Sequence, residues 1–345
     1  MRAADLGEFG LIQRWMKRIR PRGRVLVGIG DDAAVIDRGD GKVSVLTCDM
    51  LVEGVHFLLP DISARRLGSK SMAVNLSDVA AMSAEPVCAL VSIGLTSTVE
   101  VDFLDELYEG MIDMAERHGC QLVGGDTVRS PSGLVIDVFV LAEGKKDGLT
   151  LRSGARPGDV LLVTGSLGDS AAGLDVLLDR RAGGGASGAV SASSAKRVLA
   201  AHLTPEPRLP ESKAIALAGG ATAMMDISDG LANEVNHIAS RSGVSITVFR
   251  DAIPISGAAR ETAAAMGKDP LSYALYGGED YELVFTAPPG RVKEIIRSVE
   301  NSTGTRVTEI GVVGQGEGCR LAWDGGSEVL RARAFDHFVS GEVSR

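Results

Sequence analysis

Apolar side chains in the first half of the chain recur with two spacings, which predict an alternation of helices and strands. Helical spacing predicts helices over residues 11–19, 64–82 and 101–118, and Pro21 follows the end of the first. The alternation of residues 43–47 and the apolar run of residues 88–96 predict strands. Shorter apolar segments predict two further strands, at residues 121–123 and 134–141.

The second half repeats a strand-then-helix order. Residues 160–164 and 223–225 predict strands, and residues 169–178 and 231–240 predict helices. The segment 145–158 is polar and glycine-rich and separates the two halves. For a chain of 345 residues, this pattern predicts two domains of the α/β (α+β) class, residues 1–150 and 151–345.

A tract rich in glycine, alanine and serine runs from residue 181 to residue 195 and has no periodic apolar face. Such a composition offers little apolar surface to bury, so it predicts a mobile loop. We expect this loop to contribute no site residue.

Composition narrows the function classes. The formal charge is −9, which argues against a nucleic-acid-binding surface, because such surfaces carry a basic stripe. No apolar run reaches the roughly 18 residues that would cross a membrane, and residues 1–9 lack an apolar signal core, so we expect a cytoplasmic protein. The 4 cysteines form no CxxC pair and predict neither a zinc site nor a disulfide framework.

Five turns share one pattern, in which an apolar strand or helix face runs into aspartate beside Gly, Ser, Thr or Asn. Their aspartates are Asp31 with Asp32, Asp49, Asp78, Asp126, and Asp226 with Asp229. Hard cations such as Mg²⁺ take oxygen ligands and usually combine one or two carboxylates with waters and substrate phosphates. Neighbouring glycines let the backbone approach a ligand, and a following helix start can hold phosphate oxygens. The set therefore predicts a magnesium–phosphate site.

Each turn also has a structural interpretation, because aspartate and glycine are ordinary residues of turns and helix N-caps. Asp229, just before Leu231, fits an N-cap, and the acids of residues 277–280 fit a plain turn. His56 beside apolar residues, and Phe335 near the C-terminus, fit structural roles. The chain has no P-loop, protein-kinase, HExxH or GxSxG motif, so no common phosphate or hydrolase motif competes with the acidic turns.

Taken in order, these segments resemble those of the thiamine-monophosphate kinases. The matching segments are Gly-Ile-Gly-Asp-Asp-Ala (28–33), Thr-Cys-Asp (47–49), Glu-Gly-Val-His-Phe (53–57), Asn-Leu-Ser-Asp-Val-Ala-Ala-Met (75–82), Gly-Gly-Asp-Thr (124–127), Met-Asp-Ile-Ser-Asp-Gly-Leu (225–231) and Gly-Gly-Glu-Asp-Tyr-Glu-Leu (277–283). The resemblance covers about residues 7–338. Segments 53–57 and 277–283 separate this family from the related aminoimidazole-ribonucleotide and selenophosphate synthetases.

The resemblance implies an N-terminal mixed sheet with helices, which forms a barrel with the sheet of a second subunit in a homodimer. It implies a C-terminal α/β sandwich, with ATP and several Mg²⁺ ions held between the domains. It also implies the reaction, in which ATP and thiamine monophosphate give ADP and thiamine diphosphate.

The resemblance further implies roles for individual residues. The implied magnesium ligands are Asp31, Thr47, Asp49, Asp78, Asp126, Asp226 and Asp229. At Cys48 we expect only a backbone oxygen to contact metal, because a thiol is a poor Mg²⁺ ligand. The implied nucleotide contacts are Tyr108, Gly125, Asp126, Arg152 and Ser228, and the implied contacts with thiamine monophosphate are His56, Glu279 and Phe335.

This chemistry explains why an acidic protein would serve two phosphate-bearing substrates. The acids hold cations, and the cations hold the phosphates and offset their mutual repulsion. A phosphate monoester, with a second pKa of about 6, is largely ionised near pH 7, so no strong general base is required. With no nucleophile motif in the chain, we expect direct in-line transfer. The alternatives are another ATP-dependent synthetase of the same superfamily, a non-catalytic Mg-nucleotide-binding subunit, and a metal-dependent phosphatase.

Overall fold

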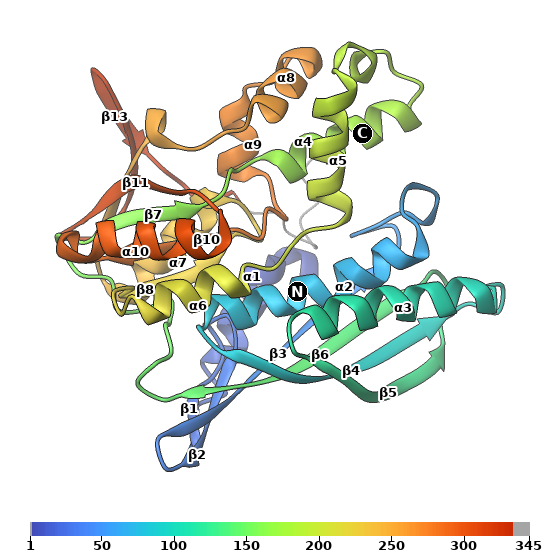
Figure 1. Cartoon of the computed structure of the whole chain (residues 1–345), viewed down its shortest axis with the longest axis horizontal. Coiled ribbons are helices and arrows are strands. Elements are labelled where there is room, and N and C mark those ends of the chain that lie inside the picture. Colours follow the sequence, from blue (N-terminus) through green and yellow to red (C-terminus); the bar gives the residue numbers. More distant parts are fainter. Residues whose placement is uncertain (1, 334–345) are drawn as a thin grey trace.

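Two β-sheets, one in each half of the chain, form the framework of the molecule (Figure 1), and the computed structural model describes residues 2–333. The first sheet has the order β1-β2-β3-β6-β4-β5. Its strands are β1 (Val25–Val27), β2 (Ala34–Gly39), β3 (Lys42–Val52), β4 (Glu85–Leu95), β5 (Gln121–Arg129) and β6 (Val135–Lys145). All neighbouring strands are antiparallel except β4 and β5, which are parallel. The prediction of a mixed N-terminal sheet is confirmed.

Helices α2 (Ala64–Ala81) and α3 (Val101–Arg117) cover one face of this sheet (Figure 1). Strand β6 shows why, because Ile136, Val138 and Val140 are completely buried while the residues between them are partly exposed. These side chains join one core with apolar residues of α2 and α3. The opposite face carries exposed apolar side chains, which include Met50 and Leu90.

Two glycines let α2 and α3 pack at very short distance. A Cβ atom on Gly68 of α2 would lie 1.9 Å from the carbonyl oxygen of Leu107, and one on Gly110 of α3 would lie 1.9 Å from that of Arg65. Neither position has room for a side chain. The closeness of this helix pair therefore depends on glycine at both positions.

The second sheet has the order β13-β12-β9-β11-β7-β10-β8. Its strands are β7 (Val160–Thr164), β8 (Ala223–Asp226), β9 (Ser245–Phe249), β10 (Leu283–Ala287), β11 (Val307–Gly314), β12 (Gly318–Trp323) and β13 (Gly326–Val329). Neighbours are antiparallel except β9 and β12. Helix α7 (Leu231–Ser242) packs on one face, and α6 (Leu209–Leu217) and α10 (Pro289–Thr303) pack on the other. The predicted α/β sandwich is confirmed.

Four further helices form a separate cluster beside the second sheet, with a small core of their own (Figure 1). They are α4 (Asp169–Arg181), α5 (Ala192–Leu203), α8 (Gly257–Met266) and α9 (Pro270–Tyr276). The prediction of a loop over residues 181–195 is therefore wrong in part. Residues 186–189 form a 3-10 helix and α5 begins at Ala192, where the Ser191 side chain accepts a hydrogen bond from the Ser194 N–H and caps the helix.

Helix α2 is also the main contact between the two halves. Its last residues, Ala80 and Ala81, belong to the core beneath α6 and α10. The Ser212 hydroxyl of α6 donates to the carbonyl oxygen of Ala80. One helix thus lies on the first sheet and touches the second half.

Helix α1 (Gly7–Met16) completes the N-terminal elements. None of the helices formed by residues 2–333 is long and apolar enough to cross a membrane. The first sheet ends at Lys145 and the second begins at Val160. The division of the chain at about residue 150 stays a prediction.

Candidate active site

Three carboxylates from different elements converge where the two halves meet. Asp32 lies between β1 and β2, Asp78 lies in the last turn of α2, and Asp226 ends β8. One carboxylate oxygen of each lies within 4.8 Å of the others. We call these three residues the acidic cluster. The first half supplies two of its members and the second half supplies one.

Neighbouring side chains hold each member of the acidic cluster in place. The Thr47 hydroxyl of β3 donates to Asp78 Oδ2, and the Ser77 hydroxyl donates to Asp226 Oδ2 at 2.6 Å. Arg152 Nη2 donates to Asp32 Oδ1 at 2.8 Å. The other oxygen, Asp32 Oδ2, is buried and has no hydrogen-bond partner within residues 2–333.

Burial and mutual repulsion raise the pKa values of these carboxyl groups. At Asp226, burial is the largest cause and repulsion from Asp32 adds to it, so the pKa of this carboxyl group rises to about 7. Burial, with Asp49 and Asp226, holds the pKa of Asp78 well above its usual range. Loss of hydration at the carboxyl group of Asp49, followed by repulsion from Asp137 and Asp32, also raises its pKa. Such a group of acids ionises readily only when a cation lies among them.

The residues fit a hard cation for two reasons. Their donor atoms are all oxygens, which Mg²⁺ prefers, and three carboxylates leave coordination positions for phosphate oxygens. In addition, Asp32 Oδ2 lacks a partner among the described atoms although it is buried, and a bound cation would supply one. Asp32 is not among the ligands implied by the resemblance, which names its neighbour Asp31.

The remaining predicted ligands lie around the acidic cluster or apart from it. Asp31 Oδ1 accepts the backbone N–H groups of Arg152 at 3.1 Å and of Asp32 at 3.2 Å, and burial, followed by repulsion from Asp32, raises its pKa to about 6. The backbone N–H of Asp49 donates to Asn75 Oδ1 of α2 at 2.8 Å. Asp229 follows β8, and its N–H donates to Glu234 Oε1 at 2.9 Å.

Cys48, Asp49 and Asp126 are exposed, whereas the other predicted ligands are partly or completely buried. Cys48 is exposed, whereas its neighbour Thr47 is buried and bonded to Asp78, as the alternation of β3 requires. Asp126 is an exposed residue of β5 that pairs in register with exposed Ser92 of β4. That register places Asp126 on the sheet face that α2 does not cover. Its side chain accepts the Thr127 N–H at 2.9 Å.

The predicted nucleotide contacts have structural partners of their own. Arg152 is paired with Asp32, and its buried Nε has no hydrogen-bond partner among the described residues. A Cβ on Gly125 would lie 1.7 Å from the carbonyl oxygen of Val91, so strand packing alone requires glycine there. Ser228 accepts the Glu279 N–H on its carbonyl oxygen at 2.7 Å. Tyr108 packs half-buried against the first core, and burial raises its pKa.

Two of the three predicted contacts with thiamine monophosphate are described. His56 Nδ1 accepts the Val52 N–H at 3.0 Å, and the His56 N–H donates to the Val52 carbonyl oxygen at 3.0 Å. Glu279 lies between β10 and α9, where it contacts Lys70 of α2 and His202 of α5. Phe335 lies outside the described residues.

Sequence reasoning missed Lys70, because the apolar spacing of its helix carries no signal for it. At about 100° per residue, Lys70 lies on the side of the helix opposite Met72, Leu76 and Val79, where a lysine is expected to face solvent. In the structure Lys70 is 1% exposed, and lysine is almost never so completely buried unless it is paired. Only the fold reveals its ion pair with Glu279.

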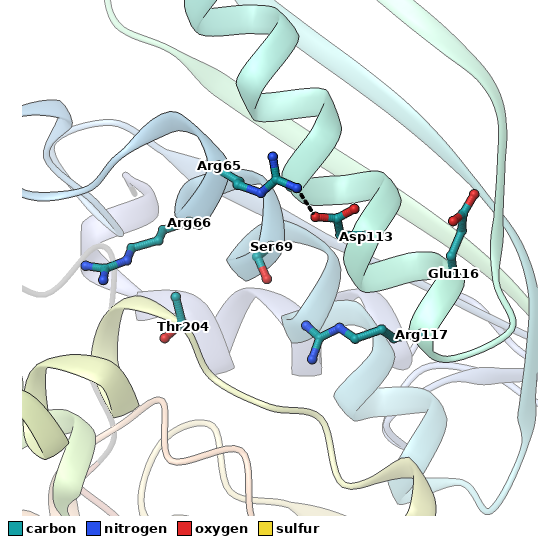
Figure 2. A pocket seen from close by; sticks show the side chains of 8 residues that line it. Arg65, Arg66, Ser69, Asp113, Glu116, Arg117 and Thr204 are labelled. Carbon is teal, nitrogen blue, oxygen red and sulfur yellow. Dashed lines mark hydrogen bonds and ion pairs between the residues drawn. The ribbon is translucent and has the colours of Figure 1, made fainter.

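A cavity of about 470 Å³ lies between α2, α3 and Thr204, apart from the acidic cluster. Figure 2 shows Arg65 and Asp113 turned toward each other as an ion pair, with Arg66 and Arg117 nearby. A second cavity, of about 390 Å³, shares Arg66 with the first. Neither lining includes a member of the acidic cluster or a predicted substrate contact.

Comparison with known proteins agrees with the site. The chain matches the family "AIR synthase related protein, N-terminal domain" over residues 30–144 and its C-terminal counterpart over residues 156–324. It is 38% identical to the thiamine-monophosphate kinase of Aquifex aeolicus over 318 residues, which cover 92% of this chain and 95% of that protein. It is 35% identical to the enzyme of Bacillus subtilis over 335 residues, which cover 96% and 100% of the two chains.

Among solved structures, the chain resembles one described as AaThiL complexed with AMPPCP and TMP. The TM-score is 0.84 at 36% identity, and the alignment covers 98% of this chain and 99% of that one. The similarity thus extends over both sheets and the junction that holds the acidic cluster. The chain belongs to the thiamine-monophosphate kinase family.

Proposed function

We propose that the chain transfers the γ-phosphoryl group of ATP to thiamine monophosphate, giving ADP and thiamine diphosphate, by direct in-line transfer at the junction of its two halves. The kinase activity and the two substrates follow from similarity to thiamine-monophosphate kinases over nearly the whole chain. The acidic cluster is the observation that supports this location for the site. Direct transfer, without a phosphorylated protein intermediate, is supported by the lack of a nucleophile motif in the sequence.

Asp32, Asp78 and Asp226 are the proposed ligands of Mg²⁺. Bound there, Mg²⁺ would draw phosphate oxygens of both substrates together and neutralise their charge during transfer. The chain's own part is to fix the three carboxylates through Thr47, Ser77 and Arg152. Positioning and electrostatic stabilisation are what phosphoryl transfer chiefly requires of a protein.

The remaining residues implied by the resemblance are kept as proposals. Further magnesium ligands would be Asp31, Thr47, Asp49, Asp126, Asp229 and the backbone oxygen of Cys48, and nucleotide contacts would be Tyr108, Gly125, Asp126, Arg152 and Ser228. Several ions are expected, since the acids exceed what one octahedral cation can bind.

We assign the acceptor end to His56, Glu279 and Phe335. Support for Glu279 comes from its charge, because thiamine monophosphate carries a cationic thiazolium ring that a carboxylate attracts. Burial would raise the pKa of Glu279, but the charge of Lys70 and contact with His202 outweigh burial and lower it to about 2. This carboxylate is therefore ionised at neutral pH.

We also propose a homodimer that forms through the first sheet. Exposed apolar side chains on the face opposite α2 and α3 support it, since a neighbouring sheet would bury them. A cytoplasmic location stays a prediction.

The test is an ADP-release assay on the purified chain, with and without thiamine monophosphate, in Mg²⁺ and in excess chelator. We expect ADP only when both the acceptor and Mg²⁺ are present. Release of phosphate from ATP without acceptor would favour a phosphatase, and no turnover with any acceptor would favour a non-catalytic subunit. Trapping a phosphorylated protein from labelled ATP alone would exclude direct transfer.

A further inference from the structure

Lys70 of α2 is a completely buried lysine at the junction of the two halves, with an exposed fraction of 1%. Its Nζ atom lies 2.9 Å from Glu279 Oε1 and 3.0 Å from Glu279 Oε2. It also donates to the carbonyl oxygen of His202 at 3.1 Å. Two of these contacts are hydrogen bonds, to Glu279 Oε2 and to the His202 carbonyl oxygen, and the third is an ion-pair contact with Glu279 Oε1. All of these partners lie in the other half of the chain.

Glu279 is held by its backbone as well as by its side chain. Its φ angle is 66°, a left-handed conformation that non-glycine residues seldom adopt. Its N–H donates to the carbonyl oxygen of Ser228 at 2.7 Å, and Tyr281, also left-handed, donates to that of Ile227 at 2.9 Å. Asp226 directly precedes Ile227 and Ser228, whose carbonyl oxygens accept these hydrogen bonds. Strained backbone of this kind tends to occur at functional sites, where the surrounding structure holds it.

The side chain of Glu279 is anchored on several sides but is not completely covered. Lys70 approaches both of its oxygens, and His202 Nδ1 lies 3.2 Å from Oε2. The Ser170 hydroxyl contacts the same His202 nitrogen at 3.1 Å, which fixes the imidazole ring. The Glu279 side chain nevertheless keeps an exposed fraction of 24%. An anchored anionic side chain that stays partly exposed is better suited to meeting a cationic ligand than a completely buried ion pair would be.

Helix α2 joins this carboxylate to the acidic cluster. Lys70 lies eight residues before Asp78, which corresponds to about 12 Å along a helix with a rise of 1.5 Å per residue. Ser77, beside Asp78, binds Asp226 at 2.6 Å. Both ends of α2 segment 70–78 are thus bonded to the second half, one at Glu279 and one at Asp226. A helix of this kind is rigid, so it sets the separation between the two anionic sites.

We propose that Lys70 is a positioning residue, which fixes the carboxylate of Glu279 at a set distance from the acidic cluster so that it meets the cationic organic part of thiamine monophosphate. This inference rests on the proposed function, in which Glu279 contacts that substrate. Lys70 itself touches no reacting atom. A substitution of Lys70 should therefore weaken binding of the acceptor, thiamine monophosphate, and leave binding of ATP unchanged.

The test compares Lys70→Met with wild type in steady-state kinetics, with each substrate varied in turn. We expect the KM for thiamine monophosphate to rise about tenfold or more while the KM for ATP stays within about twofold. Arg208→Met is the matched control, because Arg208 pairs with Glu282 of the same loop yet makes no contact with Glu279. It should lower the melting temperature without changing the ratio of the two KM values.

A second variant covers the case in which Lys70→Met removes the ion-pair partner of Glu279 and the protein fails to fold. The double variant Lys70→Met with Glu279→Gln removes both charges and is compared with Glu279→Gln alone. If Lys70 acts through Glu279, the added substitution leaves the KM for thiamine monophosphate within about twofold of the single variant.

Several outcomes would overturn the proposal. They are an unchanged KM for thiamine monophosphate in Lys70→Met, an equal rise of both KM values, and a further large rise in the double variant. A wild-type chain that does not phosphorylate thiamine monophosphate would overturn the proposed function itself. The wild-type assay thus separates that failure from failure of the role assigned to Lys70.

Discussion

At the scale of single residues, the acidic turn of residues 31 and 32 contains two adjacent carboxylates that the sequence cannot rank. The resemblance assigns the first of them to magnesium. The structure gives Asp31 two backbone N–H groups to accept, whereas Asp32 places an oxygen in the acidic cluster and keeps another without a partner within residues 2–333. Because successive side chains point in different directions, only the fold decides which of the two joins the acidic cluster.

Asp32→Asn should therefore reduce kcat by about 100-fold or more, while Asp31→Asn should reduce it much less. The amide keeps the size of the side chain but removes the negative charge that binds a cation. ADP release at saturating substrates measures the effect, and circular dichroism checks that both variants fold. An equal loss in the two variants would contradict the assignment of Asp32.

The raised pKa of Asp226 makes the stability of the metal-free protein depend on pH. The pKa is about 7 in the folded chain against 3.8 for a free carboxyl group, so the folded state binds the proton more tightly. This contribution to stability is complete below about pH 4 and is lost as pH rises through 7. We expect the melting temperature in chelator to fall by several degrees between pH 5 and pH 8.

Added Mg²⁺ should raise the melting temperature more at pH 8 than at pH 5, because it binds the ionised carboxylates. Asp226→Asn is the control and should weaken both the pH dependence and the effect of Mg²⁺. Differential scanning fluorimetry measures all of these changes. A metal-free protein that is more stable at pH 8 than at pH 5 would contradict the prediction.

At the scale of elements, strong apolar spacing allowed accurate prediction. The helix predicted over residues 64–82 is α2, Ala64–Ala81, and the strand predicted over residues 160–164 is β7. The tract of residues 181–195 failed because its last residues form the start of α5, whose apolar face lies beyond the tract at Val198 and Leu203. No element was predicted beyond residue 240, although α10 buries Val292, Ile295 and Val299 at helical spacing.

The sequence predicted which type of residue forms the candidate site, but not how these residues are arranged in space. Acidic turns identified Asp78 and Asp226, since both follow apolar segments. Their proximity depends on how α2 packs against the second half, and no local pattern records that contact. Lys70 and Glu279 are 209 residues apart, so their pairing also requires the fold.

The α2–α3 contact leads to a prediction about the whole element. Gly110→Ala would place a methyl group 1.9 Å from the Arg65 carbonyl oxygen, so the helices must separate. We expect a loss of about 3 kcal/mol or more in the free energy of unfolding, at the upper end of overpacking effects. Gly290→Ala in α10 is the control, since nothing lies within 4 Å of its added Cβ. Urea unfolding measures both, and equal stabilities would contradict the close packing.

At the scale of the whole molecule, the first sheet is covered on one side only. Leu90 of β4 is 41% exposed and Val128 of β5 is 55% exposed. They lie on the same face, since β4 and β5 pair with Leu90 opposite Gly124 and Gly94 opposite Val128. Asp126 shares this face and is not a member of the acidic cluster. A second subunit packed on this face would place Asp126 in the interface.

Leu90→Glu should therefore weaken the proposed homodimer while each chain stays folded. A charge on this face would lose its hydration if a second sheet covered it, and the two copies would repel each other across a symmetric interface. Leu217→Glu is the matched control, since Leu217 is 79% exposed and belongs to α6, which packs on the second sheet. Sedimentation velocity should show a dimer for wild type and the control, and a larger monomer fraction for Leu90→Glu. A wild-type monomer at all concentrations, or a dimer unaffected by the substitution, would exclude this face as the interface.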